Sequence, residues 1–124
     1  MYNEDIKNKI KDITKSIFQE IVSIRRWIHQ YPELSFQEKE TARYICSILK
    51  KHNIQFINGV AGYGVVALIE CRNPKSQVIG IRGDMDALPI QEKNDVEYKS
   101  MHAGIMHACG HDVHTAVILG TAIV

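Results

Sequence analysis

The sequence has no uninterrupted apolar run of about 18 residues, so it predicts no transmembrane helix. Residues 1–5 lack the basic and then apolar pattern of a secretory signal. Over the 124 residues the formal net charge is only +1, and no long run of one sign occurs. A basic surface that binds nucleic acid is therefore not expected, and neither is a membrane as a partner.

Cysteine is scarce, and its spacing excludes two common uses. The three cysteines are Cys46, Cys71 and Cys109, with no CxxC pair. An odd number without paired spacing indicates no disulfide framework, so we expect a reducing, cytoplasmic location. A closed structural zinc site is disfavoured because such sites bring Cys and His ligands in paired spacings. Residues 59–64 are glycine-rich but do not follow GxGxxG, which argues against a phosphate-binding loop and predicts a tight turn.

Two helices are predicted at the start of the chain. Isoleucines recur at spacings of three and four over about residues 6–29, which indicates an amphipathic helix with its apolar stripe on a core. Pro32 ends this helix. Ser35 followed by Glu38 fits a capping box, so we expect a second helix over about residues 36–52.

The middle of the chain predicts strands. Residues 54–57 and 65–70 suit a hairpin-like pair, and residues 77–82 are partly apolar on both faces, as central strands are. The nearly all-apolar residues 116–124 predict a helix buried on several sides. This order of elements predicts an α/β sandwich rather than a helical bundle. Because the chain stops inside an apolar run, we expect it to be the N-terminal part of a longer protein.

Two carboxylates follow the third predicted strand. Asp84 and Asp86 alternate around Met85, so an extended backbone places them on one side. Two carboxylates at such a short separation repel each other unless a cation or hydrogen-bond donors lie between them. The pair indicates either one side of a metal centre or an Asp-rich turn that caps the strand. The two residues alone leave both interpretations open.

The densest group of metal-binding side chains lies in residues 107–114. It contains His107, Cys109, His111 and His114, whose thiol and imidazoles suit zinc and neighbouring divalent metals. Cys109 and His111 are close enough in sequence to hold one ion from a loop, and His114 shares a face with His111 if a helix has begun. A single cysteine near two carboxylates favours an open, catalytic site whose remaining ligands lie elsewhere.

The three remaining histidines are expected to lie outside this site. His29 is interpreted as a polar residue at a helix end. His52 is interpreted as a surface residue that favours the dipole at the end of the second helix. His102 is interpreted as a residue that hydrogen-bonds its own loop.

Three motifs occur in a fixed order: RRxxHxxPEL at residues 25–34, RGDMDALPI at residues 82–90 and MHACGHDxHT at residues 106–115. Together they resemble the metal-dependent amidohydrolases of the aminoacylase, hippurate hydrolase and auxin-conjugate hydrolase family, within the aminoacylase-like zinc metallopeptidase superfamily. The resemblance implies that residues 1–124 form the N-terminal part of the catalytic domain. The implied fold is an incomplete α/β/α sandwich of the phosphorylase/hydrolase type, with a mixed sheet, two leading helices and no lid or dimerisation domain.

The same resemblance implies roles for single residues. Cys109 and His111 would be ligands of a dinuclear centre that holds zinc, manganese, cobalt or nickel. Asp86 would match the aspartate that orients and tunes a metal-site group, which makes it the catalytic candidate. Asp84 stands where more distant peptidases of the superfamily have a ligand histidine, so the resemblance leaves its ligand role open. The residues that would support the site from outside the two ligands are Asp84, Asp112, His114 and His107.

The implied reaction is hydrolysis of an N-acyl amino acid to a carboxylate and a free amino acid. The metals would lower the pKa of a shared water and polarise the amide carbonyl, and a glutamate of the family's Glu-Glu pair would move the proton. This sequence lacks that pair, so we expect the chain alone to be inactive. The alternatives are a dipeptidase of the same superfamily, and a short non-catalytic protein that binds metal or a partner. Complete family members can be homo-oligomers.

Overall fold

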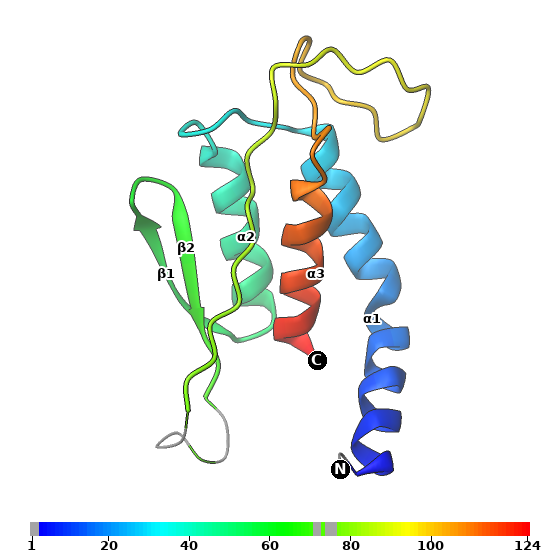
Figure 1. Cartoon of the computed structure of the whole chain (residues 1–124), viewed down its shortest axis with the longest axis vertical. Coiled ribbons are helices and arrows are strands. Elements are labelled where there is room, and N and C mark those ends of the chain that lie inside the picture. The colour runs from blue at the N-terminus through cyan, green and yellow to red at the C-terminus, as the bar shows by residue number, and fades with distance from the viewer. Residues whose placement is uncertain (1–2, 71–72, 74–76) are drawn as a thin grey trace.

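Three helices lie side by side in the structure, a computed structural model that describes residues 3–70, 73 and 77–124 (Figure 1). A β-hairpin packs against the second helix, and a long loop leads into the third. The first and third helices contact each other. In chain order the elements are α1 (Glu4–Gln30), α2 (Lys39–Lys51), β1 (Gln55–Val60), β2 (Gly64–Leu68) and α3 (His111–Ile123).

The first predicted helix is confirmed as α1, although only its C-terminal end is well buried. Asn3 caps it by accepting a hydrogen bond from a backbone amide at 3.1 Å. Ile24 and Ile28 are 1% and 0% exposed, whereas Ile6 and Ile10 are 51% and 48% exposed. The N-terminal half extends beyond the other elements of the described chain (Figure 1). The last turns of α1 therefore hold it against the rest of the molecule.

The predicted capping box at the start of α2 is wrong. Residues 35–36 form a turn outside the helix, and Glu38 at the N-cap makes no side-chain hydrogen bond to the helix end. Glu33 caps the helix instead. Its carboxylate accepts hydrogen bonds from the backbone amides of Glu40 at 3.1 Å and Thr41 at 2.7 Å. This cap crosses the turn, so the local S-x-x-E pattern does not show it.

The predicted hairpin is confirmed. The strands β1 and β2 pair antiparallel, with a register shift between Asn58 and Val60. Ala61 and Gly62 form the turn with φ of 51° and 107°, in the left-handed region that favours glycine. Position 64 requires glycine, because a Cβ atom there would lie 2.5 Å from the Val60 carbonyl oxygen.

The third predicted strand is wrong. Residues 77–82 make no strand pairing, and Val78 and Ile79 are 89% and 84% exposed. A strand needs a neighbour to accept and donate its backbone hydrogen bonds, and in the described residues only β1 and β2 form a sheet. The mixed sheet that the resemblance implies is likewise not formed by this part of the chain. Cys71 lies outside the described residues.

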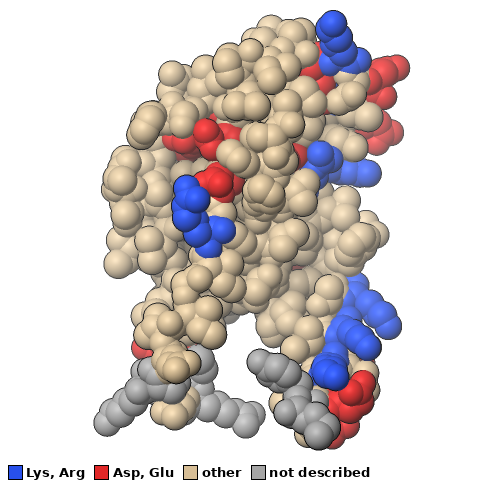
Figure 2. Space-filling view, in the orientation of Figure 1, with Lys and Arg blue, Asp and Glu red and all other residues tan. Residues whose placement is uncertain are grey.

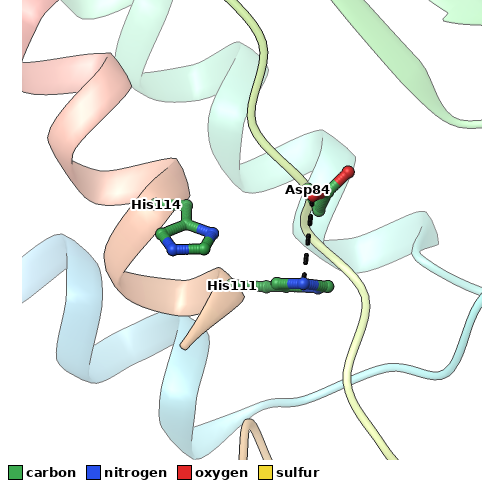
Figure 3. A group of neighbouring side chains, drawn as sticks. All are labelled: Asp84, His111 and His114. Atoms are coloured by element: carbon green, nitrogen blue, oxygen red, sulfur yellow. Dashed lines mark ion pairs between the residues drawn. The ribbon is translucent and has the colours of Figure 1, made fainter. Parts of the chain in front are cut away.

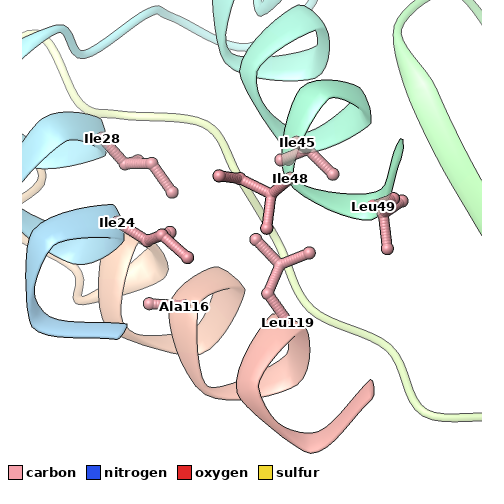
Figure 4. Close-up of a cluster of buried hydrophobic side chains, with 7 residues drawn as sticks. All are labelled: Ile24, Ile28, Ile45, Ile48, Leu49, Ala116 and Leu119. Atoms are coloured by element: carbon pink, nitrogen blue, oxygen red, sulfur yellow. The ribbon is translucent and has the colours of Figure 1, made fainter. Parts of the chain in front are cut away.

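One apolar cluster joins the three helices (Figure 4). The helix α3 begins at His111, five residues before its predicted start, so it carries polar residues in its first turn and apolar ones after it. Gly120 on α3 lies close to α1, since a Cβ atom there would be 3.1 Å from Ile21 Cδ1. The members of the cluster are Ile24, Ile28, Ile45, Ile48, Leu49, Ala116 and Leu119.

Charged side chains of both signs are scattered over the face shown in Figure 2, with a wide uncharged surface between them. Among the described residues, no helix combines the length and the apolar character needed to cross a membrane.

Candidate metal centre

The first side chain of α3 lies between two carboxylates. Gly110 precedes the helix with a left-handed φ of 87°, where the chain turns into α3. His111 Nδ1 lies 2.8 Å from Asp86 Oδ1 and 3.0 Å from the Asp86 carbonyl oxygen. His111 Nε2 lies 3.9 Å from Asp84 Oδ2 (Figure 3). The two aspartates thus face opposite nitrogens of one imidazole ring.

Asp86 determines which ring nitrogen of His111 carries the proton. A backbone carbonyl can only accept a hydrogen bond, so Nδ1 must donate. In a neutral ring this leaves the lone pair on Nε2, which is the nitrogen that faces Asp84. A carboxylate that holds the other nitrogen of a metal-binding histidine fixes the orientation of the ring and raises its basicity.

Three side chains come close enough to share one ion. Asp84, His111 and His114 each offer a ligand atom, and these atoms all lie within 4.8 Å of one another. The rings of His111 and His114 are 5.6 Å apart, on successive turns of α3 (Figure 3). Two imidazole nitrogens and a carboxylate oxygen are the donors that zinc, manganese, cobalt and nickel accept in proteins. The donor set therefore fits the predicted metals.

Cys109 approaches the same region from the other end of the loop. Its thiol is exposed, and Sγ lies 3.9 Å from the Asp86 carbonyl oxygen. Both predicted ligands, Cys109 and His111, therefore lie against Asp86. The compact three-residue group nevertheless contains Asp84 and His114 and not Cys109. The ligand roles of all four residues stay predictions, and the geometry favours Asp84 more than the family pattern does.

The Asp86 carboxyl is held in its ionised form. Burial alone would raise its pKa, but hydrogen bonds from the side chains of His111 and Ser35 and from its own backbone amide outweigh burial and lower the pKa. Asp86 is therefore a carboxylate at neutral pH, and it can accept a hydrogen bond from His111 Nδ1.

The Asp84–Asp86 segment is fixed onto α3 by close contacts. Thr115 Oγ1 donates a hydrogen bond to the Asp84 carbonyl oxygen at 2.8 Å. Gly83 passes directly over the helix, since a Cβ atom there would lie 2.5 Å from Ile118 Cδ1. The carboxylates are thereby held beside the first turn of α3.

Known proteins share this arrangement of sequence and fold. Residues 80–124, which include all the metal-binding candidates, match peptidase family M20/M25/M40. An N-acyl-L-amino acid amidohydrolase of Geobacillus stearothermophilus is 42% identical over 94% of this chain and 31% of its own length. Thermostable carboxypeptidase 1 of Saccharolobus solfataricus is 42% identical over 95% of this chain and 30% of its own length. The crystal structure of Bacillus subtilis YXEP, described as a dinuclear metal binding peptidase from the M20 family, has a TM-score of 0.83 at 44% identity over 88% of this chain and 30% of that chain.

Through residues 80–124 the chain resembles the M20/M25/M40 peptidase family. The resemblance to its metal-dependent amidohydrolases is confirmed, and so is a partial α/β fold that matches the N-terminal part of their structures. The chain spans 30% to 31% of the length of these three proteins.

Behind the candidate metal-binding side chains, the chain buries a network of charged residues. His29 lies at the end of α1, as interpreted from the sequence, but it is only 3% exposed. Its Nδ1 lies 2.7 Å from Asp112 Oδ2, and its Nε2 lies 3.0 Å from Glu92 Oε1. Arg25 Nε lies 2.8 Å from the same Asp112 oxygen. Sequence reasoning missed this network, although Arg25 and His29 stand four residues apart, on one helix face, within the first family motif.

His107 is buried beside this network. It is 4% exposed, and neither ring nitrogen has a hydrogen-bond partner in the described structure. Burial lowers the pKa of His107 to about 4, with Asp112 opposing and His29 and His111 adding to the shift. The ring is therefore neutral at pH 7. Its predicted supporting role stays a prediction, since it contacts none of the candidate ligands by a hydrogen bond in the described structure.

The other two histidines join segments that are distant in the sequence. His102 Nδ1 hydrogen-bonds a backbone carbonyl at 2.7 Å, but the carbonyl belongs to Pro32 rather than to its own loop. His52 lies half-buried at the C-cap of α2, with Nε2 2.9 Å from Glu20 Oε1. Neither belongs to the three-residue group.

Proposed function

We propose that this chain supplies part of a divalent metal centre in a hydrolase that cleaves the amide bond of N-acyl amino acids. The observation that carries the proposal is the setting of His111. Asp86 accepts a hydrogen bond from Nδ1, and the remaining nitrogen faces Asp84 within 4.8 Å of a His114 nitrogen. A surface histidine paired with one carboxylate would not need this arrangement on both sides of the ring.

The residues have separate tasks in this proposal. Asp84, His111 and His114 supply donor atoms, and the exposed Cys109 thiolate adds another from the loop. Asp86 touches no ion. It orients the ring of His111 and fixes its tautomer. Divalent ions at such a site lower the pKa of a bound water and polarise the substrate carbonyl.

The substrate class rests on the relatives. The Geobacillus stearothermophilus relative is named an N-acyl-L-amino acid amidohydrolase, and this name favours an N-acyl amino acid. A peptide substrate is the second candidate, because the Saccharolobus solfataricus relative is named a carboxypeptidase. A non-catalytic protein that binds metal or a partner is the third. We propose two ions per complete site, as in the dinuclear neighbour, drawn from zinc, manganese, cobalt and nickel.

Metal titration tests the site. The metal-free chain is titrated with Zn²⁺, Mn²⁺, Co²⁺ and Ni²⁺ in a calorimeter, and the same is done for His111→Ala. Wild type should bind with an affinity at least about tenfold above that of the variant. His52→Gln is the matched control, because His52 pairs with Glu20 outside the group. Equal binding by wild type and His111→Ala would refute the proposed centre.

Turnover tests the second part of the proposal, namely that this chain alone is not a working enzyme. The described residues gather one compact group of three donors, which is fewer than two ions require. Metal-loaded chain should hydrolyse N-acetyl amino acids, hippurate and dipeptides no faster than the free metal ion. An enzyme-like rate on either substrate class would contradict this, and the class that reacts would decide between amidohydrolase and peptidase.

We further propose a reducing, cytoplasmic location, in which the free thiols of Cys46 and Cys109 persist. Thiol titration of freshly isolated protein should find both reactive with a thiol reagent after unfolding. A disulfide between chains through Cys109 in the isolated protein would argue against that location.

A further inference from the structure

His29 joins three segments that are far apart in the sequence. It lies at the end of α1, hydrogen-bonds Asp112 in the first turn of α3, and hydrogen-bonds Glu92 in the loop before α3. Asp112 is the residue directly after His111, and it is 0% exposed. Whatever fixes Asp112 therefore also fixes the turn of helix that presents His111.

From these contacts we infer that His29 is a positioning residue for the metal centre: its Nδ1–H holds Asp112, and through the first turn of α3 it sets the orientation of His111. This inference rests on the proposed metal site. It assigns no direct contact between His29 and an ion or a substrate.

The Asp112 carboxylate depends on His29 more than on its other neighbour. Asp112 Oδ1 has no hydrogen-bond partner in the described structure. Arg25 Nε is close to Oδ2, at 2.8 Å, but it is not aligned for a hydrogen bond, so it contributes charge without direction. Arg25 Nη2 lies 3.3 Å from His29 Nδ1, but the carboxylate is closer to this nitrogen, at 2.7 Å, and can only accept, so Nδ1 donates to Asp112. This bond is the directional contact on the carboxylate among the described residues.

The other side of the His29 ring is anchored as well. Glu92 is 2% exposed and receives His29 Nε2 at 3.0 Å. The second Glu92 oxygen accepts the backbone amide of Ser100 at 2.7 Å. Both nitrogens of His29 are held from opposite sides, so the ring cannot rotate without breaking one of these bonds. A ring fixed in this way is a rigid support for Asp112.

The two nitrogens of His29 have different tasks, and this difference gives a sharp test. The amide nitrogen of asparagine stands near the position of Nδ1, whereas that of glutamine stands near the position of Nε2. His29→Asn keeps the donor toward Asp112 and loses the one toward Glu92, and His29→Gln does the reverse. If His29 only filled space or neutralised charge, the two variants would behave alike.

The experiment measures Co²⁺ affinity by calorimetry, and hydrogen exchange over residues 111–115 in the metal-free chain. We expect His29→Gln to lose about 10- to 100-fold in affinity and to exchange faster over that segment. We expect His29→Asn to stay within about threefold of wild type, close to the His52→Gln control. Equal losses in both His29 variants, or no loss in either, would overturn the inference.

The outcomes separate the inference from the proposed function. If wild type binds no metal, the proposed function fails, and the exchange measurement still decides whether His29 orders the first turn of α3. If His29→Gln does not fold, Asp112→Asn replaces it, because this variant keeps the side-chain shape but weakens the bond to His29. It should show weaker Co²⁺ binding and faster exchange, and wild-type values for both would overturn the inference.

Discussion

At the scale of single residues, the buried imidazole of His107 makes the molecule sensitive to acid. The folded chain does not protonate His107 until the pH falls to about 4, whereas the unfolded chain does so near the ordinary value of 6.5. Between these values the unfolded state binds more protons, so the stability falls as the pH falls. Asp86 and Glu92, whose pKa values are lowered, begin to lose their contributions as the pH falls through their ordinary values of 3.8 and 4.5.

We therefore expect the free energy of unfolding to decrease by up to about 3 kcal/mol between pH 6.5 and 4 through His107 alone. His107→Gln removes this titration and should flatten the dependence of Tm on pH in that window. Thermal unfolding followed by circular dichroism, with a chelator present, measures it. His102→Gln is the control, since its ring bonds a backbone carbonyl and it should keep the wild-type slope. An unchanged slope in His107→Gln would contradict the expectation.

The sequence singled out the residues that gather around His111 better than the residues packed behind them. Asp84, Asp86 and His111 belong to two short motifs, and the chemistry of these residue types suggests a metal directly. His29 and Asp112 are 83 positions apart, so their contact is a consequence of helix packing that no local pattern contains. The burial of His29 was unexpected for the same reason, because a position near a helix end is usually exposed.

At the scale of the elements, the start of α2 depends on a side chain outside the helix. Glu33 satisfies two backbone amides of the first turn, and it also accepts a hydrogen bond from Thr41 Oγ1 at 2.8 Å. Thr41 is 0% exposed, so without Glu33 its donors would be buried and unpaired.

Glu33→Ala should therefore cost about 1–2 kcal/mol in the free energy of unfolding. Glu38→Ala removes a carboxylate of the same size from the N-cap position, where it makes no capping bond, and it should cost less than about 0.5 kcal/mol. Urea denaturation of both variants gives the two values. If Glu38→Ala lost more free energy of unfolding than Glu33→Ala, the capping box predicted from the sequence would be supported instead.

Helices and strands differed in how well the sequence predicted them. The isoleucine spacing of α1 is a local signal, because a helix makes its hydrogen bonds within itself. Residues 77–82 have the composition of a central strand, but a strand exists only when another strand lies beside it. The composition of residues 77–82 favours a strand, but among the described residues no other strand pairs with this segment.

At the scale of the whole molecule, apolar surface gathers where the expected strand stays unpaired. Val78, Ile79 and Ile81 are 89%, 84% and 64% exposed, and Val66 and Leu68 of the neighbouring hairpin are 52% and 57% exposed. A surface of this kind favours association with other chains.

Ile79→Lys should leave the free energy of unfolding within about 0.5 kcal/mol of wild type, because the side chain is already in solvent. It should reduce self-association, which analytical ultracentrifugation over a range of protein concentrations measures. Lys50→Ile, on the exposed side of α2, is a matched control that adds apolar surface elsewhere and should not reduce association. A large loss of stability in Ile79→Lys would show that this segment is packed after all.

The end of α1 has one more consequence for the molecule. Ile28 enters the apolar cluster and His29, the next residue, enters the charged network, and neighbours on a helix point about 100° apart. The apolar cluster on one side and the charged network on the other fix the rotation of α1 about its axis. A rotation would expose Ile28 to solvent or remove His29 from its hydrogen-bond partners. The orientation of the His29 imidazole is in this way determined by the isoleucines that precede it in α1.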